Sequence, residues 1–285
     1  MRNITLPQVR LPYRTVKGSL QQRQDKSAQL VHKFYREIKG RFRHGEISLK
    51  EIQKCVDENL PPNINVIVKN LVQEAEDADL LGYSVLNYNS SSKINSISLE
   101  LLTAENKIPL RDLPSLMHEF THITDQLYNP KILARCQNMT EKDLYIKDYD
   151  NLYENFIYNL EEPESKKEKE YILKRLEQVI KEFLKKIPNP QDKVSYLQDS
   201  RYCTMLEING YHSQRKFAKN LAKQHVNVDE VDLMNENKNY MFSEKLELLN
   251  KLLKEVITKE RIKHRAKINR ESKKKLKFSK EIQPQ

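Results

Sequence analysis

Long hydrophobic runs are missing from this chain of 285 residues. No stretch approaches the roughly 20 uncharged apolar residues that a bilayer-spanning helix needs. The first residues also lack the continuous apolar core of a secretory signal peptide. We therefore expect a cytoplasmic protein without a transmembrane segment. Secretion by a route that needs no signal peptide is the alternative.

Cysteine is scarce and tryptophan is absent. The three cysteines are odd in number, lie far apart and form no C-x-x-C pair. This pattern argues against a disulfide framework and rules out a cysteine-rich zinc module. The chain has 14 Tyr and 8 Phe, and apolar residues recur along most of it. A globular protein with a substantial core is therefore predicted.

Positive charge is concentrated near the C-terminal end. Residues 251–285 hold 13 Lys and Arg against 4 Glu and no Asp, and so carry nearly all of the net charge of +10. The spacing of apolar residues from Leu246 to Ile257 predicts a helix that packs on the domain and continues as a basic extension. Such an extension either binds an anionic partner, nucleic acid or an acidic surface, or only keeps the protein soluble.

Helical spacing of apolar residues dominates the remaining sequence. It predicts helices over residues 19–43, 48–59, 64–77, 109–128, 144–160, 166–186 and 192–223. The pattern alternates instead over Tyr83–Asn89 and Ile94–Leu102, which predicts two antiparallel strands. The predicted fold class is α+β, mainly helical with a small antiparallel sheet that precedes the helix over residues 109–128.

We predict one domain over residues 19–250. It would lie between an N-terminal extension, residues 1–18, and the basic C-terminal helix or tail, residues 251–285.

One segment, Leu116–His122, contains the motif H-E-x-x-H in a helical context. Two histidines four positions apart, His118 and His122, lie one turn apart on one helix face, so both imidazoles can reach one metal ion. Glu119 points about 100° away, where a carboxylate can act on a water without binding the metal. The apolar residues of the helix lie on the opposite face, which predicts that the histidines face a cleft. Two surface histidines on an ordinary amphipathic helix are the alternative.

The order of a strand followed by an H-E-x-x-H helix resembles the zincin metallopeptidases. In that superfamily a strand lines the substrate cleft, as Asn95–Leu102 would here, and the next helix carries the motif. The resemblance implies a zinc-dependent metallopeptidase that hydrolyses a protein or peptide substrate with a metal-activated water. His118 and His122 would then be zinc ligands, Glu119 would be the general base, and the substrate would lie extended along residues 95–102.

The third zinc ligand would distinguish the zincin subgroups. The metzincin pattern requires Gly and His where this chain has Asp125 and Tyr128. The gluzincin arrangement uses a glutamate from a separate downstream helix, and Glu207 is the best candidate for it. Its own helix face is small or polar, and Gly210 sits inside the same helical stretch, where it would allow close approach to another helix.

Other acidic residues compete with Glu207 for this role. They are Glu154, Glu161 and Glu162. The alternative for Glu207 itself is an ordinary surface glutamate beside a helix break.

Three further residues are candidates for supporting roles, and a purely structural role is the alternative for each. Asp125 lies one turn after His122 and could hold a ligand imidazole by its second nitrogen. Tyr211 or His212, one turn beyond Glu207, could donate a hydrogen bond to the oxyanion formed during hydrolysis. The sequence does not choose between these two donors.

A second functional hypothesis belongs to a different class. The chain would be a non-enzymatic binding protein that docks nucleic acid or an acidic partner through residues 251–285. The histidines would then be incidental or part of a structural metal site.

Overall fold

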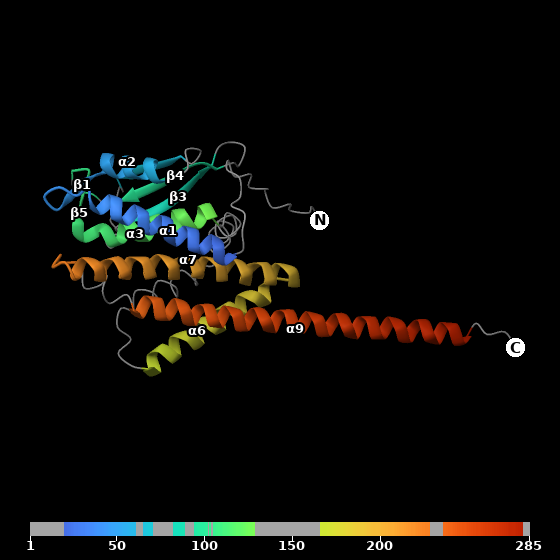
Figure 1. Cartoon of the computed structure of the whole chain (residues 1–285). Coiled ribbons are helices and arrows are strands. Elements are labelled where there is room, and N and C mark those ends of the chain that lie inside the picture. The colour runs from blue at the N-terminus through green and yellow to red at the C-terminus, as the bar shows by residue number, and fades with distance from the viewer. Residues whose placement is uncertain are drawn as a thin grey trace. The chain divides into compact units, whose positions relative to one another are not determined.

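The computed structural model describes residues 20–60, 65–70, 82–88, 94–101, 103, 105–128, 166–228 and 236–281 (Figure 1). The chain divides into two compact units. Met1–Asn138 and Cys203–Phe242 form the first unit, and Met139–Tyr202 and Ser243–Gln285 form the second. The domain boundaries predicted at residues 18 and 250 stay predictions, and the helix predicted over residues 144–160 lies outside the described residues.

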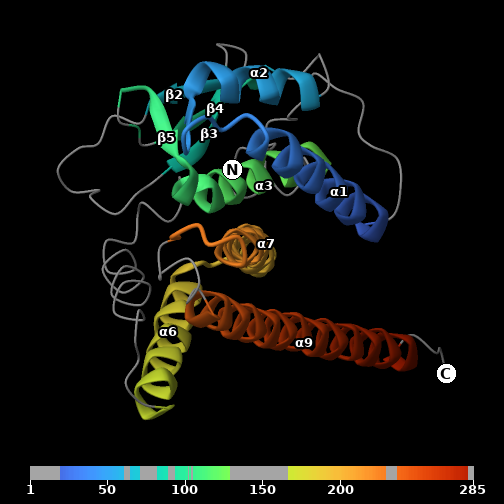
Figure 2. The ribbon, with the colours of Figure 1, turned by 60° about the vertical axis from the view of Figure 1, so that its left-hand side comes forward.

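The first unit contains all of the described strands and the motif helix. Its elements are α1 (Leu20–Lys39), β1 (Glu46–Ser48), α2 (Leu49–Asn59), β2 (Val66–Asn70), β3 (Gly82–Tyr88), β4 (Ile94–Leu101), β5 (Lys107–Pro109), η1 (Leu110–Asp112) and α3 (Leu113–Tyr128). Helix α7 (Pro190–Ala222) belongs to this unit from Cys203 onward. Within the unit, α2 covers one face of the sheet formed by β2, β3 and β4, and α3 with α1 covers the other (Figures 1 and 2).

The predicted antiparallel strand pair is present and belongs to a larger sheet. β3 and β4 pair antiparallel from Gly82 opposite Leu101 to Tyr88 opposite Ile94. β2 lies on the other side of β4 and runs parallel to it, so the sheet order is β2-β4-β3. A second, two-stranded antiparallel sheet joins β1 and β5. The fold is therefore mainly helical with small sheets before the motif helix, as predicted, but the larger sheet is mixed.

The helix predicted over residues 64–77 is wrong at Val66–Asn70, which form β2. Val66, Ile67 and Val68 are β-branched residues that suit a strand, and the backbone of β4 supplies their pairing partners. The partner strand lies about 30 residues later in the chain, so helical spacing within the segment cannot reveal it.

Strand β4 is the centre of its sheet. From Ile97 to Leu101 it pairs with β2 on one side and β3 on the other. Its backbone N–H and C=O groups are therefore already used within the sheet. The prediction that an extended substrate pairs along Asn95–Leu102 is wrong for this central part of the strand, because β-augmentation requires an open edge.

Helix α3 forms the centre of the first unit. Every residue from Leu113 to Leu127 is buried, and the ribbon places α3 between the sheet and α7, with α1 beside it (Figures 1 and 2). The rings of Phe34 on α1 and Phe120 on α3 stack with their centroids 3.7 Å apart. Burying a side chain of this size contributes about 1.5–3 kcal/mol, so this contact fixes the helix that carries the motif.

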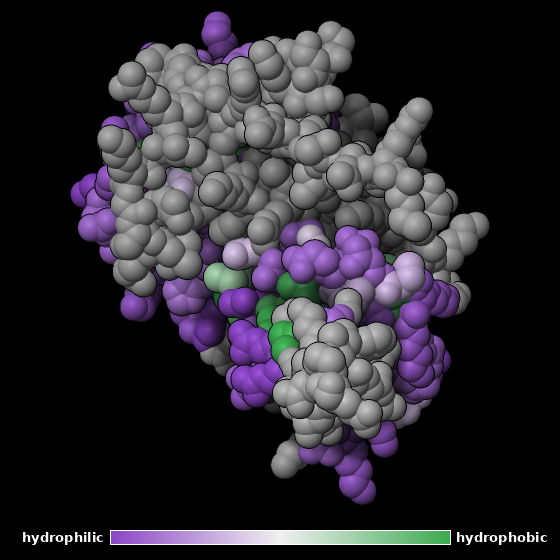
Figure 3. All heavy atoms as spheres, turned by 90° about the vertical axis from the view of Figure 1, so that its right-hand side faces the viewer, coloured by the Kyte–Doolittle hydropathy of each residue, from purple (hydrophilic) through white to green (hydrophobic). Residues whose placement is uncertain are grey.

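The second unit contains α6 (Lys166–Lys186), the beginning of α7, and α9 (Glu236–Glu281) from Ser243 onward. Lys251 on α9 donates a 2.9 Å hydrogen bond to Glu177 on α6, and Leu252 and Leu253 are buried (Figure 2). Further along α9, Ile262 is 62% exposed. The described residues on this side of the molecule are mostly hydrophilic (Figure 3). As predicted, α9 is therefore packed at Leu252 and Leu253 and continues as an exposed basic helix.

Among the described residues, no helix is long and apolar enough to cross a membrane.

Candidate metal centre

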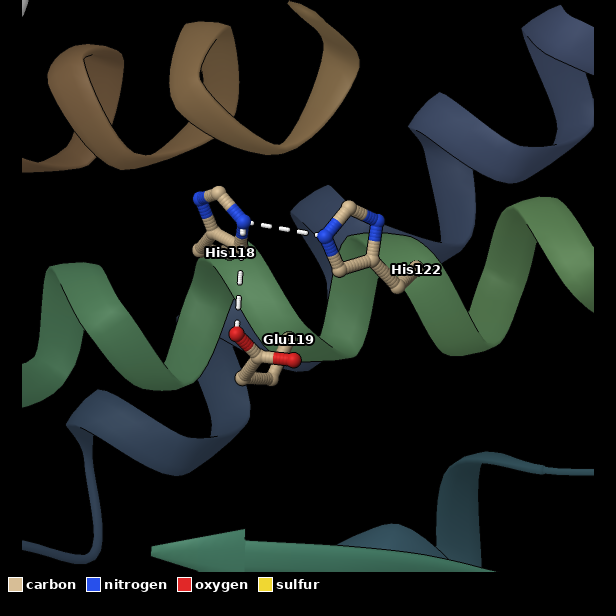
Figure 4. Close-up of side chains that lie close together, drawn as sticks. All are labelled: His118, Glu119 and His122. Atoms are coloured by element: carbon tan, nitrogen blue, oxygen red, sulfur yellow. Dashed lines mark hydrogen bonds and ion pairs between the residues drawn. The ribbon is translucent and has the colours of Figure 1, made fainter. Parts of the chain in front are cut away.

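The H-E-x-x-H residues form a compact cluster on α3. His118 and His122 project from the same side of the helix, and their Nε2 atoms lie 2.9 Å apart (Figure 4). The Oε1 atom of Glu119 lies 3.9 Å from Nε2 of His118. One donor atom from each of the three residues falls within 4.8 Å of the others, close enough to surround a metal ion.

Helix α7 adds a fourth residue to this cluster, Glu207, which was predicted as the third ligand. Glu207 places Oε2 at 3.6 Å from Nε2 of His118 and Oε1 at 3.6 Å from Nε2 of His122. Its carboxylate therefore spans both imidazoles, whereas Glu119 approaches one. The side chain of Glu207 is 36% exposed, against 9% for His118, so Glu207 lies at the solvent side of the cluster.

The donor set fits a zinc ion of the open, catalytic type. Tetrahedral zinc with nitrogen and oxygen ligands at about 2.0–2.2 Å has ligand atoms roughly 3.4 Å apart. The Nε2 atoms of His118 and His122 lie 2.9 Å apart, and each lies 3.6 Å from a different carboxylate oxygen of Glu207, which are distances close to that value. Two histidines and one glutamate leave a fourth position for water.

Gly210 brings the backbone of α7 directly against His118. A Cβ atom at residue 210 would lie 2.8 Å from both Cε1 and Nε2 of that imidazole, a distance that real Cβ contacts do not reach. The sequence predicted close helix contact at this glycine, and the structure confirms it. The neighbouring Tyr211 packs its ring edge-on against the imidazole of His118 at 4.6 Å and stacks on Phe242.

Gln214 holds the other nitrogen of His118. Its Oε1 atom lies 2.9 Å from Nδ1 of the imidazole, and both side chains are buried. Gln214 lies on the small or polar helix face that was predicted for Glu207, and no role was predicted for it. Its spacing of seven residues from Glu207, two helical turns, is the signal that could have identified it.

Asp125 does not hold an imidazole, so its predicted role is wrong. Its Oδ1 accepts a 2.8 Å hydrogen bond from Ser27 on α1, and its Oδ2 accepts one of 2.8 Å from Asn209 on α7. These contacts join three helices one turn beyond His122. Burial raises the pKa of Asp125, although both hydrogen bonds act in the opposite direction.

The predicted open cleft in front of the histidines is also wrong. His118 and His122 are buried, because α7 covers the face of α3 that an isolated amphipathic helix would leave in solvent. An adjoining cavity of about 360 Å³ between α1, α3 and α7 is lined by Asp125, His212 and Lys216, among others. His212 is exposed there, whereas Tyr211 contacts the metal-site imidazole.

Burial and charge act differently on the two histidines. Burial acts to lower the pKa of His118, but the hydrogen bond to Glu207 and the charges of Glu119 and Glu207 outweigh it and raise that pKa. Burial lowers the pKa of His122 to about 4, and the attraction of Glu207 offsets this only in part. His122 therefore stays neutral at neutral pH and retains a lone pair that can bind a metal.

The competing ligands Glu154, Glu161 and Glu162 lie outside the described residues. Comparisons with protein-family models, with curated proteins and with solved structures give no significant match. The chemistry of the cluster is therefore inferred from its own geometry.

Proposed function

We propose that the chain is a zinc-dependent metallopeptidase. The supporting observation is that the carboxylate of Glu207 places one oxygen 3.6 Å from Nε2 of His118 and the other 3.6 Å from Nε2 of His122, with Glu119 beside His118. Two buried imidazole nitrogens facing each other, with a carboxylate across both, form an electron-rich pocket that a divalent cation would stabilise. An ordinary surface pair of histidines would have no reason to be buried together against a glutamate from a distant helix.

His118, His122 and Glu207 would hold the zinc ion. When bound, zinc supplies a Lewis acid that lowers the pKa of water to about 7 and polarises a carbonyl oxygen. Glu119 accepts a proton from the attacking water while the oxygen of that water bonds to the peptide carbonyl carbon. When the C–N bond breaks, Glu119 transfers that proton to the leaving nitrogen. Overall, one water molecule is added across the peptide bond.

Tyr211 is the better of the two predicted oxyanion donors. Its ring lies against His118, whereas His212 lines the adjoining cavity. The phenol O–H of Tyr211 would donate to the oxygen that becomes negatively charged, and its removal would cost about 10²–10³-fold in kcat.

Cleavage of a denatured protein by the purified chain tests the proposal. Glu119→Gln preserves the shape of the side chain but cannot accept the proton, so we expect a fall of about 10²–10⁴-fold in rate with zinc still bound. Glu260→Gln, a change on α9 away from the cluster, is the matched control and should cleave like wild type. Equal cleavage by wild type and Glu119→Gln would contradict the proposed role.

A further inference from the structure

Strand β2 lies at one edge of its sheet in the described part of the chain, where β4 is its one neighbour. The backbone C=O of Asn65 accepts the N–H of Ile97 on β4 at 2.8 Å. Because successive residues of a strand direct their N–H and C=O groups to opposite sides, those of Val66 and Val68 point away from β4. Such outward groups at a sheet edge are a template for pairing with another strand.

Gln53 on α2 makes the hydrogen bonds that an added strand would make at this edge. Its Nε2 atom donates to the C=O of Val66 at 2.7 Å, and its Oε1 atom accepts the N–H of Val68 at 2.8 Å. Nε2 also donates to Oδ1 of Asp57, one turn later on α2, at 2.8 Å. Both hydrogens of the amide are therefore used, and the contact with Asp57 orients the amide toward the strand.

The sequence of β2 suits pairing with a copy of itself. Val66, Ile67 and Val68 are β-branched, and the side chain of Ile67 is 38% exposed. Two β2 strands paired antiparallel about Val68 would join their outward N–H and C=O groups to one another. Ile67 would then lie opposite Lys69 of the second copy, so no two like charges would face each other.

We propose that the outer edge of β2 is an interaction surface for β2 of a second copy of this chain, and that the side chain of Gln53 blocks it. Gln53 and the second copy compete for the same two backbone groups. The edge is therefore closed while the amide is in place, and removing the amide joins the sheets of two copies. Asp57 is a positioning residue for Gln53. The proposal uses no residue of the metal centre and does not rest on the proposed function.

Sedimentation of the full chain tests the proposal. Gln53→Ala removes both hydrogen bonds to β2, so this variant should reach twice the mass of wild type as its concentration rises. Gln178→Ala is the matched control, because that amide contacts Arg175 and Glu182 of its own helix, α6, and it should sediment like wild type. Adding Ile67→Lys to Gln53→Ala should restore the wild-type mass, because it places two ammonium groups opposite each other across the paired strands.

Two sedimentation results would overturn the proposal. One is a Gln53→Ala variant with the mass of wild type at every concentration. The other is a doubled mass that persists after Ile67→Lys is added, because the copies would then not be joined through β2.

Amide hydrogen exchange gives a second readout that needs no pairing of copies. At low concentration the N–H of Val68 should be protected in wild type and should exchange about tenfold faster or more in Gln53→Ala. The N–H of Ile97, which bonds to Asn65 within the sheet, should exchange at the wild-type rate in both, which shows that the variant is folded. A wild-type Val68 amide that exchanges as fast as an unbonded one would show that Gln53 does not close this edge.

Discussion

At the scale of single residues, the close contact between Gly210 and His118 leads to a specific prediction. The space that a side chain would need there is filled by the imidazole of His118. Gly210→Ala should therefore displace that ring and weaken zinc binding by about tenfold or more. Alanine also favours a helix by about 1 kcal/mol over glycine, so the loss of zinc affinity need not come with a loss of helical structure.

Gly40→Ala is the matched control for Gly210→Ala. A Cβ atom at residue 40 would meet only backbone oxygens at 3.5 and 3.6 Å, which are ordinary contacts. Zinc titration monitored by calorimetry should show wild-type affinity for the control and weaker binding for Gly210→Ala. Equal affinities for both variants would mean that the close approach of α7 is not part of the site.

The sequence predicted which residues come together better than it predicted their surroundings. The spacing of His118 and His122 places two imidazoles together on any helix, and Gly210 marked the helix that approaches them. The partner of Asp125 was predicted wrongly, because a buried carboxylate on this face had several possible donors from other helices. Only the folded chain brings Ser27 and Asn209 to it.

At the scale of elements, the contact between Asp125 and Asn209 holds α7 on α3. Asn209→Asp would place two carboxylates face to face in a buried position, so we expect the free energy of unfolding to fall by about 2 kcal/mol or more. Adding Asp125→Asn restores one acceptor and one donor across the contact. The double variant should regain most of the lost stability in urea unfolding.

The double variant with Asn209→Asp and Asp125→Asn can also contradict this prediction. If the double variant is as unstable as Asn209→Asp alone, the two side chains do not form a pair that fixes the helices.

Elements that depend on local spacing were predicted well, and those that depend on distant partners were not. Ser48 caps α2 by accepting a 3.2 Å hydrogen bond from the backbone N–H of Glu51, and the helix ends at Asn59 before two prolines. These signals lie within the segment itself. In contrast, β2 is a strand because it pairs with β4, and the polar face of α3 is buried because α7 covers it. The spacing of apolar residues within one segment cannot predict such contacts with distant segments.

At the scale of the whole molecule, the basic charge and the candidate metal centre lie in different units. On α9, Leu252 and Leu253 are buried and Lys251 donates a hydrogen bond to Glu177 on α6, so a truncation that removes charge without disturbing these contacts should follow Thr258. Loss of residues 259–285 should leave zinc content and peptide cleavage unchanged. Retention on immobilised DNA should fall and lose its steep salt dependence.

This truncation also distinguishes the two functional hypotheses. If DNA retention is lost on truncation while His118→Ala changes neither retention nor any cleavage, the chain is a binding protein rather than a peptidase. If truncation abolishes zinc binding, the metal centre is not confined to the first unit.

The most direct test of the central claim is the zinc content of the purified chain after exposure to zinc and removal of the excess. We expect one zinc ion per chain for wild type and Glu119→Gln, and loss of zinc from His118→Ala and Glu207→Ala. Wild-type protein without zinc would contradict the proposed centre itself. Full zinc affinity in Glu207→Ala would show that Glu207 is not the third ligand.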